Sequence, residues 1–301
     1  MSANDRSSGP GWMDAALLMA VLIWGTNFSI VKFALAEMTP MSYNALRFGG
    51  ASVLTLLFAR IVERNIRIDR RDWGYFLLLS LIGNLLYEIL YINGLALSRA
   101  GDSSLILSTA PIWVAILGTL TRQEHLRPVN WAGITLSFAG LYILLSSSGK
   151  GLIEQRGTTL GGLLVLASAM CWAFYTLLLR RMVQRYSTLV TTAWVMTITT
   201  PVLVLAAVPD LLKQNWQAIS SRSWLGLAYS TVMAIAVGYT IWSTGVKRVG
   251  SARTAVYSYL TPLVSVTFAW ITLGEVMRPL QGLGAGAILL GVVLGRYRPA
   301  R

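Results

Sequence analysis

Two stretches of the chain, PIWVAILGTLTRQEHLRPVNWAGITLSFAG (residues 111–140) and PLVSVTFAWITLGEVMRPLQGLGAGAILLG (residues 262–291), follow one pattern. Each begins with a proline, has a glutamate thirteen residues later, and continues with an Arg-Pro pair and two glycines. Six matched positions are 151 residues apart: Pro111 and Pro262, Glu124 and Glu275, Arg127 and Arg278, Pro128 and Pro279, Gly133 and Gly284, and Gly140 and Gly291. A constant offset of this kind indicates an internal duplication.

A second pair of matching segments lies near the start of each half. Trp24 in LLMAVLIWGTNF corresponds to Trp172 in VLASAMCWAFYT, at an offset of 148 residues. A few residues of slippage in loops account for the difference between the two offsets. The duplication thus covers nearly the whole chain, and we predict a first unit over residues 1–148, a linker over 149–157 and a second unit over 158–301.

The composition is typical of a chain embedded in a membrane. Hydrophobic residues make up 55% of the 301 residues and charged residues only 12%, whereas soluble domains contain about 25% charged residues. Apolar runs long enough to span a bilayer lie near residues 14–36, 41–61, 73–97, 101–121, 128–147, 158–180, 188–208, 223–245, 250–273 and 279–296. We therefore predict an all-α membrane protein of ten transmembrane helices, with no room for a sizeable soluble domain.

The basic residues predict the orientation of these helices. The net charge is +13, but the lysines and arginines lie between apolar runs rather than in one patch, which argues against a nucleic-acid partner. If both termini are cytoplasmic, 17 of the 25 basic residues fall on the cytoplasmic side and only 6 on the other. Because positive loops are retained in the cytoplasm, we predict a multi-pass protein of a bacterial-type inner membrane with both termini cytoplasmic.

The number of helices in each unit predicts how the two units are related. Five is an odd number, so the second unit enters the membrane from the opposite side and the units form an inverted 5+5 repeat. Secondary transporters often have this design, with a substrate site near the bilayer midplane at the repeat interface. We expect a central cavity there, and the alternative is an old duplication retained only for packing.

Three charged residues, Lys32, Arg47 and Glu88, fall inside predicted helices. Charge is costly in a membrane and usually marks a cavity, a relay or a buried pair. We predict that Glu88 binds the ammonium group of a substrate, and that Lys32 or Arg47 binds its carboxylate. The alternatives are a mutual ion pair and snorkelling of the two basic side chains to the surface.

Two prolines, Pro111 and Pro262, fall about midway along the fourth and ninth predicted helices. A proline inside a helix removes a backbone hydrogen bond and leaves carbonyl groups to be satisfied elsewhere. We predict that these positions break their helices beside the binding region and act in gating. A plain packing kink is the alternative.

Polar and aromatic residues deep in the predicted helices complete the candidate substrate-binding site. A buried phenol or indole needs a hydrogen-bond partner, and its ring face attracts cations; core packing is the alternative for each ring. Besides Glu88, the candidates are Trp24, Asn27, Tyr91, Ser108, Trp172, Tyr175, Tyr239, Trp242, Tyr257 and Tyr259. Residues near the predicted helix ends, expected at the membrane interface, are Trp12, Trp73, Trp131, Trp216, Trp224 and Tyr297.

Other residues are expected to serve packing rather than substrate binding. The last predicted helix has glycines four residues apart, a spacing that permits close helix contact: Gly282 with Gly286, and Gly291 with Gly295. We expect the fifth and tenth helices to be packing elements, at a repeat or dimer interface. Glu124 and Glu275 are expected to fix the Arg-Pro turns that follow them.

The sequence offers little for catalysis. His125 is the only histidine and falls in a predicted loop, so neither a histidine-based metal site nor a membrane-buried triad can be built. Cys171 is the only cysteine and lies within an apolar run. We expect no enzyme activity, no cofactor and no metal.

These motifs resemble the drug/metabolite transporter superfamily, specifically its EamA-like ten-helix exporters. The resemblance covers nearly the whole chain: LIWGTNF in the first helix, the stretch from Pro40 to Arg47-Phe48, and the two Pro-to-Glu-to-Gly signatures. It implies an inverted repeat, a cavity lined mainly by helices one, three, four, six, eight and nine, and alternating access. Many relatives export amino acids or related metabolites, whereas others carry sugars, nucleotide conjugates or organic cations. Trp194 lies near the position that would match Arg47, so Arg47 has no assumed counterpart.

The predicted function is therefore a secondary transporter that exports amino acids or related small metabolites, as a monomer or homodimer surrounded by membrane lipid. A carrier of another solute, a channel and a receptor are the alternatives.

Overall fold

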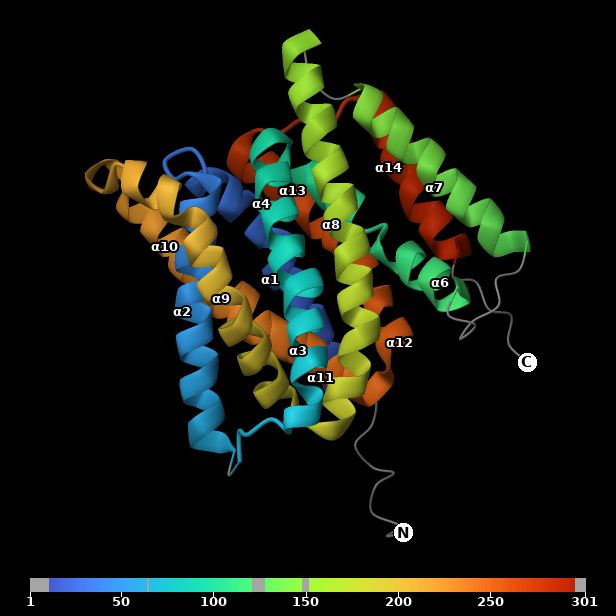
Figure 1. The fold of residues 1–301 in the computed structure, drawn as a ribbon. Helices are drawn as coiled ribbons and strands as arrows, with labels where there is room; N and C mark the ends of the chain where they lie inside the picture. Colours follow the sequence, from blue (N-terminus) through green and yellow to red (C-terminus); the bar gives the residue numbers. More distant parts are fainter. Residues whose placement is uncertain (1–10, 64, 121–127, 148–151, 296–301) are drawn as a thin grey trace.

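A computed structural model describes residues 11–63, 65–120, 128–147 and 152–295, and every regular element in these ranges is helical (Figure 1). Some of the helical segments are continuous and others contain a break or a change of helix type. In chain order, they are α1 (Gly11–Ala34), α2 (Pro40–Val62), α3–η3–α4 (Trp73–Ser80, Leu81–Leu86, Tyr87–Leu97), α5–α6 (Ala100–Leu107, Ala110–Leu120), α7 (Pro128–Ser147), α8 (Leu152–Arg185), α9 (Thr188–Lys213), α10–η5–α11 (Ser221–Tyr229, Ser230–Val237, Gly238–Val249), α12–η6–α13 (Ser251–Val256, Tyr257–Leu260, Thr261–Leu273) and α14 (Pro279–Gly295). Short 3-10 turns, η2 (Arg70–Asp72) and η4 (Trp216–Ala218), precede α3 and α10.

The predicted all-α fold of ten helical segments is thus confirmed within the described ranges. Seven of these segments are long and apolar enough to cross a membrane by length and composition. α8 begins at Leu152, so this helix already includes most of the segment expected to be a linker. Glu124, His125 and Arg127 lie outside the described residues.

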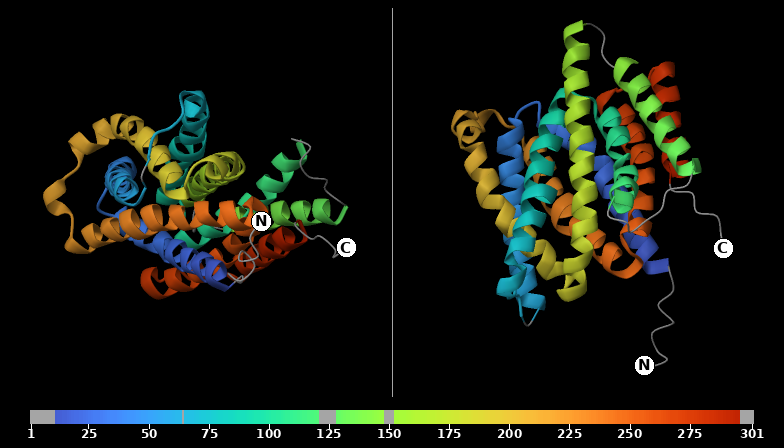
Figure 2. Two further views of the ribbon diagram at one scale, coloured as in Figure 1. Left: turned by 90° about the horizontal axis from the view of Figure 1, so that it is seen from below. Right: turned by 45° about the vertical axis from the view of Figure 1, so that its right-hand side comes forward.

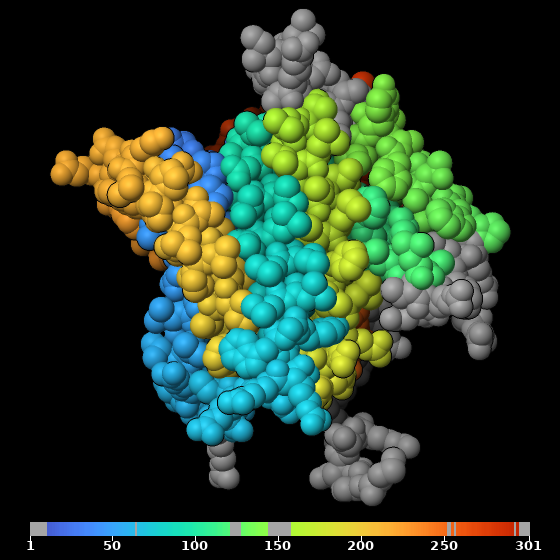
Figure 3. Space-filling view, viewed as in Figure 1, coloured from blue at the N-terminus to red at the C-terminus, as the bar shows by residue number. Residues whose placement is uncertain are grey.

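The outer surface of the bundle is apolar. Figure 3 shows the face on which α9, α3–α4 and α8 lie side by side, and large apolar side chains such as Leu205 and Ile61 are 71% and 81% exposed. Only lipid accommodates so much exposed apolar surface without cost. The tryptophans expected at the membrane interface are between 36% and 52% exposed: Trp12, Trp73, Trp131, Trp216 and Trp224.

The two repeats have opposite orientations, as the loops that follow α2 and α9 show. The first loop bonds to α8 and α9, where Asp72 pairs with Arg185 (2.6 Å) and the Trp194 indole donates to the Ile66 carbonyl (2.6 Å). The equivalent loop, 151 residues later, bonds to the corner between α1 and α2, where the Gln214 amide donates to the Glu37 carbonyl (2.9 Å). α2 separates these two ends by about 34 Å at 1.5 Å per residue.

The helices α7 and α14 pack against each other through matched glycines (Figure 2). A Cβ atom at Gly140 would lie 2.6 Å from the Gly284 carbonyl oxygen, and one at Gly291 would lie 2.5 Å from that of Gly133. Gly140 and Gly291 are 151 residues apart, and so are Gly133 and Gly284. The two contacts are therefore related by a pseudo-two-fold axis. The expected close packing of these helices is confirmed. The expected Gly282 and Gly286 pair is not part of it, since a Cβ at Gly282 would meet only Met277 Sδ at 3.9 Å and one at Gly286 would meet nothing within 4 Å.

This difference between two glycines of α14 predicts opposite effects of the same substitution. Gly286→Ala should leave stability unchanged or raise it by up to about 1 kcal/mol, because alanine is the better helix former. Gly291→Ala should cost about 1–3 kcal/mol, because its methyl group overlaps the α7 backbone. Apparent unfolding temperatures in detergent measure both effects, and a Gly291→Ala protein as stable as Gly286→Ala would contradict this packing.

Candidate functional site

The third and eighth helical segments each contain a π-helical stretch at equivalent positions. η3 covers Leu81–Leu86 and η5 covers Ser230–Val237, and each ends shortly before a polar residue, Glu88 or Tyr239. These two residues are 151 positions apart. A π-helical turn has i→i+5 hydrogen bonds and is frequent at functional sites. The two stretches therefore bring equivalent positions of the repeats to the centre of the bundle.

Glu88 and Arg47 form an ion pair at this centre. The Arg47 Nη2 atom donates to Glu88 Oε2, and both side chains are at most 3% exposed. The Tyr239 hydroxyl donates to the other carboxylate oxygen, Oε1, at 3.1 Å. Asn44, one turn before Arg47, accepts from its Nη2 atom at 2.6 Å and donates to the Glu88 carbonyl at 3.4 Å. Each charge thus has a counter-charge and further hydrogen bonds from neighbouring side chains, as a buried pair requires.

Aromatic rings surround the guanidinium. The Cζ atom of Arg47 lies 5.6 Å from the ring centroid of Tyr43, 5.7 Å from that of Phe48 and 6.0 Å from that of Tyr91. Ring faces attract a cation, and they do so more strongly where water is excluded. The rings therefore favour the charged form of Arg47 in a region where its hydration is lost.

The ion pair forms part of the wall of a cavity between the two repeats. Elements of both repeats line it, with α1, α2, α4, α5 and α6 on one side and α8, η5, α11, η6 and α13 on the other. The lining consists of Trp24, Asn27, Phe28, Arg47, Tyr87, Glu88, Tyr91, Ser104, Leu107, Ser108, Ala110, Trp172, Ala234, Ile235, Tyr239, Ser258 and Thr261. A largely apolar cavity with a few convergent polar groups is typical of a small-molecule site.

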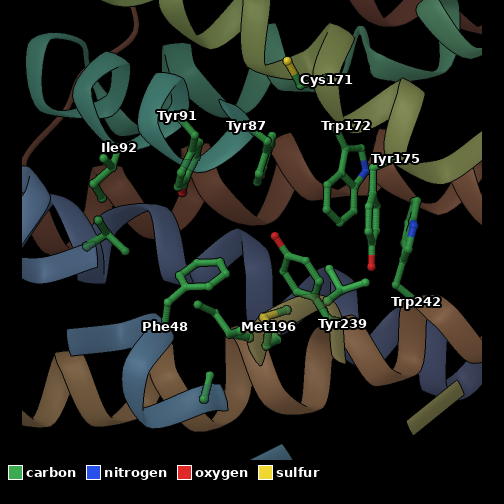
Figure 4. Close-up of a cluster of buried hydrophobic side chains, with 14 of the residues drawn as sticks. Phe48, Tyr87, Tyr91, Ile92, Cys171, Trp172, Tyr175, Met196, Tyr239 and Trp242 are labelled. Carbon is green, nitrogen blue, oxygen red and sulfur yellow. The ribbon is translucent and has the colours of Figure 1, made fainter. Parts of the chain in front are cut away.

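Aromatic side chains form one continuous cluster along this cavity (Figure 4). The Trp24 and Trp172 rings, which the repeat places at matching positions, are 5.8 Å apart and perpendicular. Trp172 also contacts Tyr87 at 5.1 Å and Tyr239 at 5.3 Å between ring centroids. Tyr87 stacks on Tyr91 at 5.7 Å. The cluster gives the cavity a rigid apolar wall that faces the charged pair.

The structure places seven of the candidate substrate-binding residues in the cavity lining: Trp24, Asn27, Glu88, Tyr91, Ser108, Trp172 and Tyr239. Tyr175 and Trp242 lie behind them, with ring centroids 5.2 Å and 5.4 Å from that of Trp172. Tyr257 and Tyr259 are not in the cavity lining. The Tyr257 hydroxyl donates to Asp14 of α1, and Tyr259 packs beside a second apolar cluster of α5, α6, α7, α8 and α14 residues.

The two basic residues considered as charge partners have different surroundings. Arg47 contacts Glu88, whereas the Lys32 ammonium group donates to the carbonyl oxygens of Leu95 (3.0 Å) and Ala96 (2.7 Å). Leu95 is seven residues beyond Glu88, which is about 10 Å along α4. Lys32 therefore binds free carbonyls at the end of α4, where a cation is favourable.

Both proline positions lie next to interruptions of their helices. α5 ends at Leu107 and α6 begins at Ala110, so Ser108 and Thr109 form a turn before Pro111. In the second repeat, the 3-10 stretch Tyr257–Leu260 precedes α13, which has Pro262 in its first turn. Ser108 and Thr261 from these breaks line the cavity. The breaks are thus equivalent in the two repeats, and each brings a hydroxyl group to the same space.

Several polar residues of the site were not singled out from the sequence. The Tyr43 hydroxyl donates to Ser230 (2.7 Å), and Ser230 donates to Asn27, which links α2, η5 and α1. Asn44 could have been recognised from the sequence, because it is polar and lies one helical turn before Arg47. Asp102 is a buried carboxylate, only 4% exposed, in the first turn of α5. It was missed because it lies near the end of its apolar run.

Glu275 has a role that the sequence did not indicate. Its carboxylate accepts from the backbone N–H groups of Ala100 (3.0 Å) and Gly101 (3.1 Å). It thereby caps the N-terminus of α5, where a negative charge complements the helix dipole. Arg99 lies at 4.0 Å from the same carboxylate. Glu275 is therefore a link between the two repeats at one end of the bundle.

The ten helical segments, the inverted repeat and the cavity between the halves define a membrane transporter rather than an enzyme. The sequence profile of the EamA-like transporter family matches residues 11–146 and 159–296, so the chain belongs to this family. A solved crystal structure with 20% sequence identity has the same fold, with a TM-score of 0.68 over 94% of this chain and 96% of that chain.

Several similar proteins are named transporters or efflux pumps. An uncharacterized transporter of Synechocystis, sll0355, is 29% identical over 296 residues, covering 94% of this chain and 89% of that protein. A protein of Escherichia coli named a probable amino-acid metabolite efflux pump is 29% identical over 290 residues, covering 93% of each chain. Its Salmonella typhimurium namesake is 27% identical over 288 residues.

A double substitution tests whether Arg47 and Glu88 act as one unit. Glu88→Leu should destabilise the protein by roughly 3–5 kcal/mol, because it leaves Arg47 buried without a counter-charge. The double variant Arg47→Met, Glu88→Leu should recover most of this loss, because no uncompensated charge remains. Apparent unfolding temperatures of the purified variants measure the coupling. Losses that simply add would show that the two residues do not depend on each other.

Proposed function

We propose that this chain is a secondary carrier that exports amino acids or closely related zwitterionic metabolites through the cavity between its repeats. The observation that carries the proposal is the Arg47–Glu88 pair in the cavity wall. The carboxylate of a zwitterion can take the place of Glu88 beside Arg47. Its ammonium group can take the place of Arg47 beside Glu88. Such an exchange keeps every buried charge paired, so that binding does not require an isolated charge in the membrane.

The remainder of the cavity suits the apolar part of such a substrate. Trp24, Trp172 and Tyr239 provide ring faces, and Asn27 and Ser108 provide polar groups at its edge. Glu88, Tyr91, Trp24, Asn27, Ser108, Trp172 and Tyr239 are therefore the proposed contact residues, with Arg47 as the carboxylate partner. Tyr175 and Trp242 are proposed to support these rings. The name of the Escherichia coli relative agrees with this substrate class.

Alternating access follows from the equivalent helix breaks. Each repeat has one interruption beside the cavity, before Pro111 or Pro262. Bending at one break and then at the other would open the same site to the two sides in turn, as in other carriers with inverted repeats. We therefore propose Pro111 and Pro262 as the gating positions, and Lys32 as a residue that secures the end of α4.

The orientation in the inner membrane is part of the proposal. The loops after α2, α8 and α11 meet at one end of the bundle, where Arg185 pairs with Asp72 and the Lys247 ammonium group donates to the Tyr186 carbonyl. These basic loops support a cytoplasmic location for this end and for both termini.

A counterflow experiment in proteoliposomes tests the proposal. Vesicles preloaded with one unlabelled amino acid at a time should accumulate the same radiolabelled amino acid, and the amino acids that drive uptake identify the substrate. Glu88→Gln should reduce counterflow at least about tenfold, because one charged hydrogen bond to the ammonium group is lost. Glu63→Gln, which changes a carboxylate outside the cavity, is the matched control.

Two results would contradict the proposal. The first is counterflow that is as fast in Glu88→Gln as in Glu63→Gln. The second is flux without counterflow, which indicates a channel rather than a carrier.

A further inference from the structure

A second cavity, separate from the one between the repeats, lies at the outer surface of the bundle. It is formed by α1, α10 and α13. Its lining is largely apolar and consists of Ser29, Ile30, Phe33, Arg222, Leu225, Gly226, Tyr229, Phe268, Thr272 and Leu273. Leu225 is 71% exposed and Arg222 and Thr272 are also exposed, so this groove opens toward the surrounding membrane.

The groove has one positive charge at its end. Arg222 lies in the first turn of α10, and its Cζ atom is 4.1 Å from the ring centroid of Phe33. In the part of the chain that the structure describes, Arg222 forms no ion pair. The carboxylate of the same corner, Glu37, instead accepts from the Ser220 backbone N–H group at 2.8 Å. Arg222 thus remains available to an anion.

Arg222 lies at the depth in the membrane where lipid headgroups are expected. It lies at the same end as the loop 214–220, beside Trp216 and Trp224, whose rings stack at 6.3 Å between centroids. Exposed tryptophans of this kind mark the boundary between headgroups and acyl chains. A guanidinium held against a ring at this boundary is well placed to bind a phosphate group.

A buried hydroxyl deeper in the groove has no partner. Ser29 Oγ is buried and, among the described residues, it forms no hydrogen bond, although Ser29 lines the groove. A Cβ atom at Gly226 would lie 3.0 Å from Ile30 Cγ2, so Ser29 is at about the depth of Gly226. Gly226 is four residues beyond Arg222, or about 6 Å along the helix. An unsatisfied buried hydroxyl at this depth calls for an acceptor from a ligand.

We infer that this groove is a binding site for an anionic glycerophospholipid. Its phosphate binds Arg222, an ester carbonyl accepts from Ser29, and an acyl chain lies along Ile30, Leu225 and Phe268. The site explains together the unpaired cation, the unsatisfied hydroxyl and the exposed apolar groove. It is independent of the proposed transport function, because it lies outside the cavity between the repeats.

The experiment is native mass spectrometry of the detergent-purified protein titrated with palmitoyl-oleoyl phosphatidylglycerol. Arg222→Gln should weaken lipid binding about tenfold, because a charge-assisted hydrogen bond is lost. Thr272→Trp should also weaken it, because the ring fills the groove from an exposed position. Lys213→Gln is the matched control, since it removes one exposed charge at the same end of the bundle without touching the groove.

Two further ligands separate the contributions of the phosphate group and of the acyl chains to lipid binding. Diacylglycerol with the same acyl chains lacks the phosphate, and glycerol phosphate lacks the acyl chains, so both should bind more weakly than phosphatidylglycerol. Equal binding of diacylglycerol would overturn the role of Arg222, and full competition by glycerol phosphate would overturn that of the groove. Equal lipid affinity of Arg222→Gln and Lys213→Gln would overturn the site itself. Lipid affinity is read without transport, so failure here leaves the counterflow result unaffected.

Discussion

The Arg47–Glu88 ion pair is the interaction around which the centre of this protein is organised. Neither charge is stable alone at this depth, because hydration is lost and only a counter-charge with full hydrogen bonding replaces it. The pair fixes α2 against α4, and the Tyr239 hydroxyl extends it to α11 of the other repeat. A single polar contact thus determines the relative position of three helices and the chemistry of the cavity that they enclose.

The inverted repeat explains why Glu88 meets Tyr239, because residues at equivalent positions contact each other near the pseudo-two-fold axis. Glu88 and Tyr239 occupy equivalent positions, and so do the π-helical stretches before them and the breaks before Pro111 and Pro262. The repeats have nonetheless diverged in charge, because Glu88 pairs with a tyrosine rather than with a second carboxylate. A symmetric frame therefore holds an asymmetric site, which suits a substrate with two different charged ends.

Hydropathy, the odd number of helices per unit and the constant 151-residue offset predicted the fold, because lipid imposes length and apolarity on each helix. The charged candidates were found for the same reason, since an ionised side chain is conspicuous in an apolar run. A mutual ion pair was one of the alternatives, but which basic residue pairs with Glu88 was not predictable. Residue counting gives the depth of Lys32 and Arg47 but not the face of the helix on which each lies.

The π-helical stretches made it still harder to predict the helix face on which a residue lies. A wider turn changes the phase of every later residue, so a period of 3.6 residues cannot place Glu88 relative to Trp73–Ser80. Glu275 shows a related limit, because its contact with α5 depends on how the two repeats meet. A single sequence therefore does not give the contact partners of side chains that lie at the interface between the repeats.

The proposed transport requires a water-accessible cavity between the repeats that opens to each side of the membrane in turn. The most direct measurement is the reactivity of a cysteine at Ser108 with a membrane-impermeant thiol reagent, in a protein whose own Cys171 is replaced by serine. Ser108→Cys should react with reagent added from either side of the membrane and be protected by substrate. Ser137→Cys, buried where α7 meets α14, should stay unreactive. A Ser108→Cys protein that reacts from neither side would contradict the account.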